Sequence, residues 1–116
     1  MTHQDDQAIA GALEAAAEGG RPCALATVVA TKGSTPRKTG ARMVVDPLLG
    51  LTGTVGGGCG EAEVIEAAQR VLETRQPERV QVDLTEDFLS WSPAVCGGVM
   101  DVFVEAVGPV EAPEAP

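Results

Sequence analysis

Residues 23–31 place the strongest constraint on the fold of this chain, because they form an almost continuous apolar run after Pro22. The run has the length of a strand, and its β-branched residues lie towards its end. A strand that is apolar at nearly every position is typical of one covered on both faces of a sheet. We therefore predict that residues 23–31 form a central strand.

The rest of the chain alternates between helical and strand-like patterns. Apolar residues recur at helical spacing before Gly19 and again after Glu61. Further strands are predicted at residues 42–46, 51–55, 79–84 and 98–105, the first two of them joined as a hairpin. These elements predict a small α/β domain over residues 1–107, with a mixed β-sheet and packed helices. The proline- and glutamate-rich residues 108–116 offer nothing to bury, and we expect a disordered tail there.

The charge of the chain restricts its partners. The 116 residues include 17 acidic and 8 basic side chains, for a formal net charge of −9, which disfavours nucleic acid and acidic membranes. The cations are unevenly distributed, and no acid occurs between Glu18 and Asp46. Four cations fall within eleven residues of a glycine- and proline-containing loop: Lys32, Arg37, Lys38 and Arg42. This loop is either a solvated rim or an attractor for a small anion.

The cysteines indicate the cellular compartment. There are three of them, without CxxC spacing, which fits neither a disulfide framework nor a structural zinc site. The start of the chain lacks the pattern of a signal peptide, and no apolar run is long enough to span a bilayer. We therefore expect a cytoplasmic protein with reduced thiols, in which Cys23 belongs to the core.

Two segments combine a cysteine with glycines. Cys59 follows Gly56, Gly57 and Gly58 where the second helix begins, and a helix N-terminus favours a thiolate or another anion. Cys96 precedes Gly97 and Gly98 at the entrance to the last strand, where glycines permit a tight bend or close approach of a ligand. Cys59 is either a site residue or a small buried one, and the two alternatives stay open. For Glu61 we prefer the interpretation that its charge complements the helix dipole. The alternative is that it acts as an acid or base beside Cys59.

Four spaced motifs resemble the XdhC/CoxI family. They are TKGSTPR at residues 31–37, GARM at 40–43, GTVGGGCGE at 53–61 and VCGG at 95–98. The resemblance extends over about residues 23–107 and keeps the order of the motifs. The positions that match the family's motifs, and that the resemblance marks as cofactor-binding, are Ser34, Pro36, Arg37, Gly56, Gly57, Gly58, Cys59, Glu61, Cys96, Gly97 and Gly98.

The resemblance implies an accessory protein more than an enzyme, and it assigns no catalytic or metal-ligating residue. Such a chaperone transiently binds the molybdenum cofactor, molybdopterin, assists its sulfuration, and inserts it into xanthine dehydrogenase or carbon monoxide dehydrogenase. The implied partners are the molybdenum hydroxylase apoenzyme and a cysteine desulfurase. Many relatives continue into a Rossmann-like domain that is missing here, so a separate chain or a homodimer is expected to complete the site.

Two other functions stay open on the residues alone. A thiol protein that transfers sulfur or senses redox state through Cys59 or Cys96 would show a depressed thiol pKa and rapid alkylation. An interaction subunit without a ligand would need the glycines only for packing. In that protein, glycine substitutions would unfold the domain and Arg37→Ala would change nothing.

Overall fold

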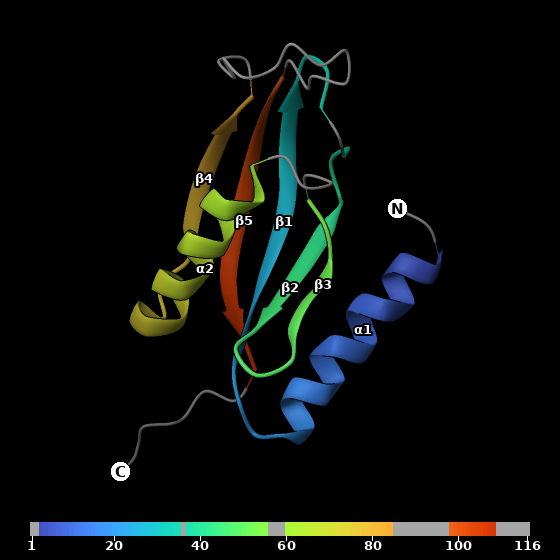
Figure 1. Ribbon diagram of the computed structural model, residues 1–116, viewed down its shortest axis with the longest axis vertical. Coiled ribbons are helices and arrows are strands. Elements are labelled where there is room, and N and C mark those ends of the chain that lie inside the picture. Colours follow the sequence, from blue (N-terminus) through green and yellow to red (C-terminus); the bar gives the residue numbers. More distant parts are fainter. Residues whose placement is uncertain (1–2, 36, 56–59, 85–97, 109–116) are drawn as a thin grey trace.

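The computed structural model describes residues 3–35, 37–55, 60–84 and 98–108 (Figure 1). These residues form two helices and five strands: α1 (His3–Glu18), β1 (Cys23–Lys32), β2 (Arg42–Asp46), β3 (Gly50–Gly53), α2 (Glu61–Thr74), β4 (Glu78–Asp83) and β5 (Val99–Val107). The strands make one sheet in the order β3-β2-β1-β5-β4. The α/β class is confirmed, and β1 lies at the centre of the sheet as predicted. No helix in the described ranges is long and apolar enough to cross a membrane.

The sheet differs from the prediction in the direction of its strands. All four described pairings are antiparallel, whereas a mixed sheet was predicted. The strands β3 and β4, which are joined through α2, do run in the same direction, and so does β1. However, the last strand, β5, inserts between β1 and β4 and is antiparallel to both. The prediction of a mixed sheet was therefore wrong, and the five described strands form an antiparallel sheet.

The two helices cover opposite faces of the sheet. Helix α2 packs on the face that carries Ala24, Ala26 and Val28 of β1, which all lie in the main hydrophobic core. Helix α1 packs on the other face, where Ile9 and Ala16 meet Cys23 and Val44. Alternate residues of β1 are thus buried against different helices, which explains why the strand is apolar at nearly every position.

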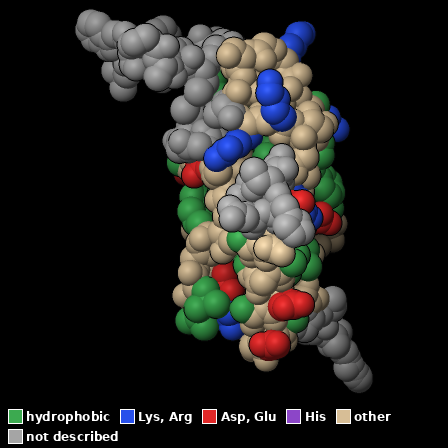
Figure 2. Space-filling view, turned by 90° about the vertical axis from the view of Figure 1, so that its right-hand side faces the viewer, with side chains coloured by type: hydrophobic (Ala, Val, Ile, Leu, Met, Phe, Trp, Pro, Cys, Tyr) green, Lys and Arg blue, Asp and Glu red, His purple; other side chains and the backbone are tan. Residues whose placement is uncertain are grey.

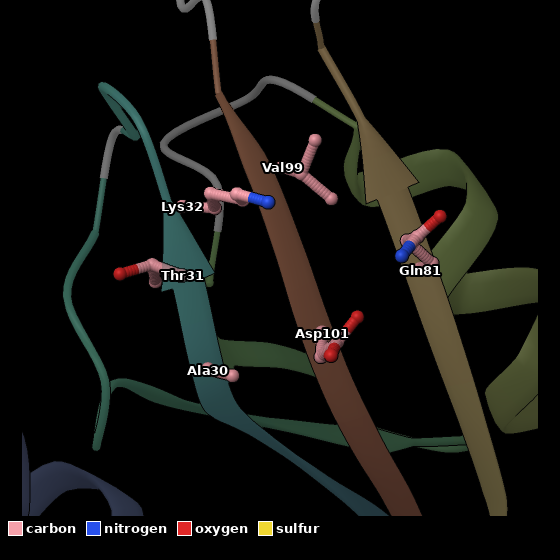
Figure 3. Close-up of a pocket in the computed structure, with 6 residues that line it drawn as sticks. All are labelled: Ala30, Thr31, Lys32, Gln81, Val99 and Asp101. Carbon is pink, nitrogen blue, oxygen red and sulfur yellow. The ribbon is translucent and has the colours of Figure 1, made fainter.

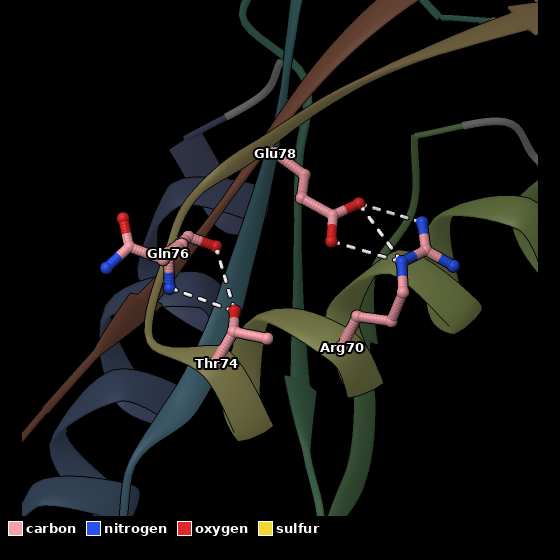
Figure 4. Close-up of polar contacts among 4 residues, drawn as sticks. All are labelled: Arg70, Thr74, Gln76 and Glu78. Carbon is pink, nitrogen blue, oxygen red and sulfur yellow. Dashed lines mark hydrogen bonds and ion pairs between the residues drawn. The ribbon is translucent and has the colours of Figure 1, made fainter.

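The end of α2 is fixed by local polar contacts (Figure 4). Arg75 takes the left-handed conformation with φ of 62°, and its N–H donates to the carbonyl of Val71 at 2.8 Å. The backbone N–H of Gln76 donates to Oγ1 of Thr74 at 3.0 Å. Arg70 pairs with Glu78 of β4 at 2.7 Å, so this arginine ties the helix to the strand that follows it.

A partly buried ion pair between Arg21 and Asp46 lies at one end of the sheet. The loop between β1 and β2 lies at the other end. Asp46, at the end of β2, is 5% exposed, and both of its oxygens accept hydrogen bonds from Arg21 at 2.9 Å. Its Oδ1 also accepts the backbone N–H groups of Leu48 and Leu49. The Arg21 hydrogen bonds are the main reason why the pKa of Asp46 lies well below its usual range, and the two N–H groups add to this effect.

Candidate functional site

The described motif residues gather at one end of the sheet. Because the pairings are antiparallel, β1, β3 and β4 end there while β2 and β5 begin there (Figure 1). The connection between β1 and β2 carries Ser34 and Arg37, and β5 is preceded by Gly98. Segments that are more than sixty residues apart in the sequence therefore meet at this end, as a common site requires.

Gly98 makes the closest link between two of the motifs. A Cβ atom built on Gly98 would lie 2.5 Å from the carbonyl oxygen of Lys32, 2.6 Å from that of Ser34 and 2.8 Å from Cγ2 of Thr35. The carbonyl of Gly98 also accepts the N–H of Leu84 at 2.9 Å. Glycine at this position allows the backbone that enters β5 to lie directly against the loop that carries Ser34.

The four cations of the sequence analysis surround this loop, and we refer to residues 32–42 as the cationic loop. The side chains of Lys32, Arg37 and Lys38 are exposed, and Arg42 is half-buried with one contact to Asp6 at 3.4 Å. Within the loop, Oγ1 of Thr35 donates to the carbonyl of Arg37 at 2.9 Å. Figure 2 shows Lys and Arg side chains gathered in the upper half of the molecule, the end at which this loop lies in Figure 1. The loop therefore presents positive charge to solvent on an otherwise acidic protein.

Glu61 lies in the first turn of α2, where it complements the helix dipole as interpreted from the sequence. Its carboxylate has a second role, because it accepts a hydrogen bond from the hydroxyl of Thr54. Thr54 follows β3 directly, so this contact joins the two described segments on either side of residues 56–59. Thr54 was not among the predicted site residues, although its place within the GTVGGGCGE motif, two residues before the glycine cluster, was the signal that could have found it.

Gly60 forms the N-cap of α2 in the left-handed conformation, with φ of 72° and ψ of 7°. A Cβ atom at this position would overlap Cγ1 of Val82, which is fully buried in β4. Two independent requirements, backbone conformation and space, thus demand glycine at the start of the helix.

We expect Gly60→Ala to lower the free energy of unfolding by about 3 kcal/mol, because strain in the left-handed region adds to the overlap with Val82. Urea unfolding measures this loss. Gly20→Ala is the matched control, since Gly20 has φ of 70° and nothing within 4 Å of its Cβ position. It should cost only about 1 kcal/mol of backbone strain. Equal losses in the two variants would show that the Val82 contact contributes nothing.

Several predicted site residues lie outside the described residues. They are Pro36, Gly56, Gly57, Gly58, Cys59, Cys96 and Gly97. Of the predicted set, the structure places Ser34, Arg37, Glu61 and Gly98. It also confirms that Cys23 belongs to the core, since this residue is 1% exposed. Burial raises the pKa of the Cys23 thiol, and the nearby Asp46 carboxylate raises it further, so this thiol is not activated.

Comparison with known proteins identifies the family to which the chain belongs. The sequence model of the XdhC and CoxI family matches residues 16–83. The uncharacterized protein YqeB of Escherichia coli strain K12 is 36% identical over 75% of this chain, and a probable xanthine dehydrogenase component of Bacillus subtilis strain 168 is 32% identical over 82%. A crystal structure of a xanthine dehydrogenase from Bacillus halodurans superposes with a TM-score of 0.71 and 35% identity over 85% of the chain.

The chain is thus similar in sequence to these relatives, and in fold to the Bacillus halodurans protein. This chain belongs to the XdhC and CoxI family. It spans 16% of the length of YqeB, 29% of the Bacillus subtilis protein and 30% of the Bacillus halodurans chain. The similarity therefore concerns one domain of larger proteins.

Proposed function

We propose that this domain binds the molybdenum cofactor transiently and assists its sulfuration and insertion into a molybdenum hydroxylase of the xanthine dehydrogenase or carbon monoxide dehydrogenase type. Family membership supports the proposal, together with the names of the two relatives that refer to xanthine dehydrogenase. The observation that carries it is the meeting of the cationic loop with Gly98 at one end of the sheet.

The described residues fit one part of this cofactor. Molybdopterin carries a phosphate group, and the exposed side chains of Lys32, Arg37 and Lys38 supply the donors that a phosphate requires. Ser34 is also exposed and adds a hydroxyl to the same loop. The net charge of −9 disfavours phosphate binding over most of the surface, whereas residues 32–42 contain four cations and no acid.

The cofactor would supply a molybdenum centre with sulfur ligands, which would suit the thiols of Cys59 and Cys96. In this proposal the chain itself performs the binding. The cationic loop holds the phosphate, while the contact between Thr54 and Glu61 fixes the start of α2 beside the glycine cluster.

The partners belong to the same proposal. They are a molybdenum hydroxylase apoenzyme, which would receive the cofactor, and a cysteine desulfurase, which would supply the sulfur. The matched parts make up only 16–30% of the length of these relatives. A separate chain with a Rossmann domain, or a second copy of this chain, would then help to enclose the cofactor.

We expect Arg37→Ala to reduce retention of the cofactor at least tenfold, since a charge-assisted hydrogen bond to phosphate contributes about 1.5–3 kcal/mol. The protein is mixed anaerobically with cofactor released from a donor enzyme and recovered by gel filtration, and the co-eluting pterin is measured. Arg70→Ala is the control. Arg70 lies on α2, outside the cationic loop, and pairs with Glu78 of β4. If folded wild-type protein retains no pterin, or if Arg37→Ala retains as much as Arg70→Ala, the proposal is wrong.

One observation favours a second candidate, the interaction subunit without a ligand. Gly60 and Gly98 both have packing reasons to be glycine, so neither requires a ligand nearby. This candidate predicts that Arg37→Ala leaves every binding property unchanged. The gel-filtration experiment therefore distinguishes the two functions.

A further inference from the structure

A hollow of about 390 Å³ lies on the part of the sheet that faces away from α2 (Figure 3). It is lined by Ala30, Thr31, Lys32, Gln81, Val99 and Asp101, which belong to β1, β5 and β4. Its volume falls within the range of small-molecule sites in proteins. None of these residues is among the positions that the family resemblance marks as cofactor-binding, although Thr31 and Lys32 lie within the TKGSTPR motif.

The strand register places five of the six lining residues in two rows, and the sixth, Thr31, is paired with Met100. Gln81, Asp101 and Ala30 are direct cross-strand neighbours, and Val99 is the direct neighbour of Lys32. Side chains of such neighbours are about 5 Å apart, and the two rows are about 7 Å apart along β5. Figure 3 shows Asp101 and Gln81 side by side, with Lys32 extending over β5 next to Val99. A carboxylate, an amide and an ammonium group thus lie on the same face of the sheet as the apolar side chains of Ala30 and Val99.

This set of groups selects a particular kind of ligand. The apolar side chains of Ala30 and Val99 can pack against the face of a flat ring. The carboxylate of Asp101 accepts two neighbouring N–H donors, and the amide of Gln81 or the ammonium of Lys32 donates to a carbonyl oxygen. The 2-amino-4-oxopyrimidine edge carries these groups in this order, and it is common to pterins and guanines. The carboxylate of Asp101 is recessed, with a side chain 26% exposed, which strengthens its hydrogen bonds relative to those of an exposed acid.

We propose that this hollow binds the 2-amino-4-oxopyrimidine edge of a pterin or guanine ring, with Asp101 as the acceptor. This assignment rests on the proposed function, because it gives a place to the ring of a cofactor whose phosphate is assigned to the cationic loop. Lys32 connects the proposed ring site with the proposed phosphate site, because it lines the hollow and is also the first residue of the cationic loop. The two sites therefore adjoin each other.

The test is a titration of isotope-labelled protein with neopterin and, separately, with guanosine 5′-monophosphate, followed by nuclear magnetic resonance. We expect neopterin to shift the backbone amides of Ala30, Lys32, Gln81, Val99 and Asp101, with a dissociation constant of about 1 mM or below. Lumazine has oxygen in place of the 2-amino group of pterin and should bind at least tenfold more weakly. Binding of the guanosine nucleotide would show that the ring of a dinucleotide form is accepted as well.

Two variants separate ligand recognition from structure. Asp101 pairs with Arg79 at 3.1 Å, so Asp101→Asn and Arg79→Gln both break this ion pair. Arg79 does not line the hollow. We expect Asp101→Asn to weaken neopterin binding at least tenfold and Arg79→Gln to leave it equal or tighter. Equal weakening in both variants would mean that the pair has only a structural role and would overturn the proposal.

Failure of this inference is distinguishable from failure of the proposed function. Neopterin has no phosphate, so its binding does not depend on Arg37. If neopterin and the guanosine nucleotide both leave the lining amides unshifted, the hollow is not a ring site, whatever the cofactor-retention experiment shows. If the lining amides shift with neopterin while the cofactor is not retained, the ring site stands and the chaperone function does not.

Discussion

Replacing Gly98 with alanine is expected to lower the free energy of unfolding by about 3 kcal/mol or more, because the new methyl group meets atoms that cannot rotate away. Its two closest neighbours would be backbone carbonyl oxygens, those of Lys32 at 2.5 Å and of Ser34 at 2.6 Å. Relief requires either β5 or the cationic loop to shift. In a thermal unfolding experiment this corresponds to a midpoint lower by about 10 °C or more.

Gly11→Ala is the matched control for this substitution. Gly11 lies within α1 and has nothing within 4 Å of its Cβ position, so the same chemical change meets no obstacle. Because alanine favours the helix, this variant should be more stable than the wild type by about 0.5–1 kcal/mol. A Gly98→Ala variant as stable as the wild type would contradict the close packing of β5 against the cationic loop.

Asp46→Ala is expected to cause a loss of similar size, about 3 kcal/mol, because it leaves Arg21 without its two charge-assisted hydrogen bonds. It also removes the acceptor for the N–H groups of Leu48 and Leu49, which form the turn between β2 and β3. Thermal or urea unfolding at neutral pH measures the effect. Glu78→Ala is the control, since it breaks an exposed ion pair and should change stability little. Equal effects from the two substitutions would contradict a special role for the Arg21–Asp46 pair.

The same ion pair makes stability depend on pH. The folded protein holds the pKa of Asp46 below its ordinary value of 3.8, so the folded state binds this proton less readily than the unfolded state. The pair therefore contributes fully to the free energy of unfolding when the pH is above the ordinary pKa of 3.8. This contribution is lost as the pH falls below that pKa. The urea midpoint of the wild type should fall between about pH 5 and pH 2, and Asp46→Ala should show a smaller fall over the same range.

The extent of agreement between sequence and structure differs from element to element. The prediction for β1 was confirmed because its apolar run demands cover on both faces, and α1 and α2 supply that cover. The second helix was also confirmed, since Val64, Ala68 and Val71 form a single buried stripe. The insertion of β5 between β1 and β4 was missed, because strand periodicity shows which face is buried but contains no information about the neighbouring strand.

For the candidate site, the sequence by itself determined the motifs, the concentration of cations at residues 32–42, and hence the resemblance to the XdhC/CoxI family. These are properties of local composition and spacing, which are complete before the chain folds. Only the tertiary structure decided that Gly98 lies against Lys32 and Ser34, that Thr54 donates to Glu61, and that Gln81 and Asp101 share a hollow with Lys32. Those contacts depend on strand order and register, which are set by the packing of the whole sheet against its two helices.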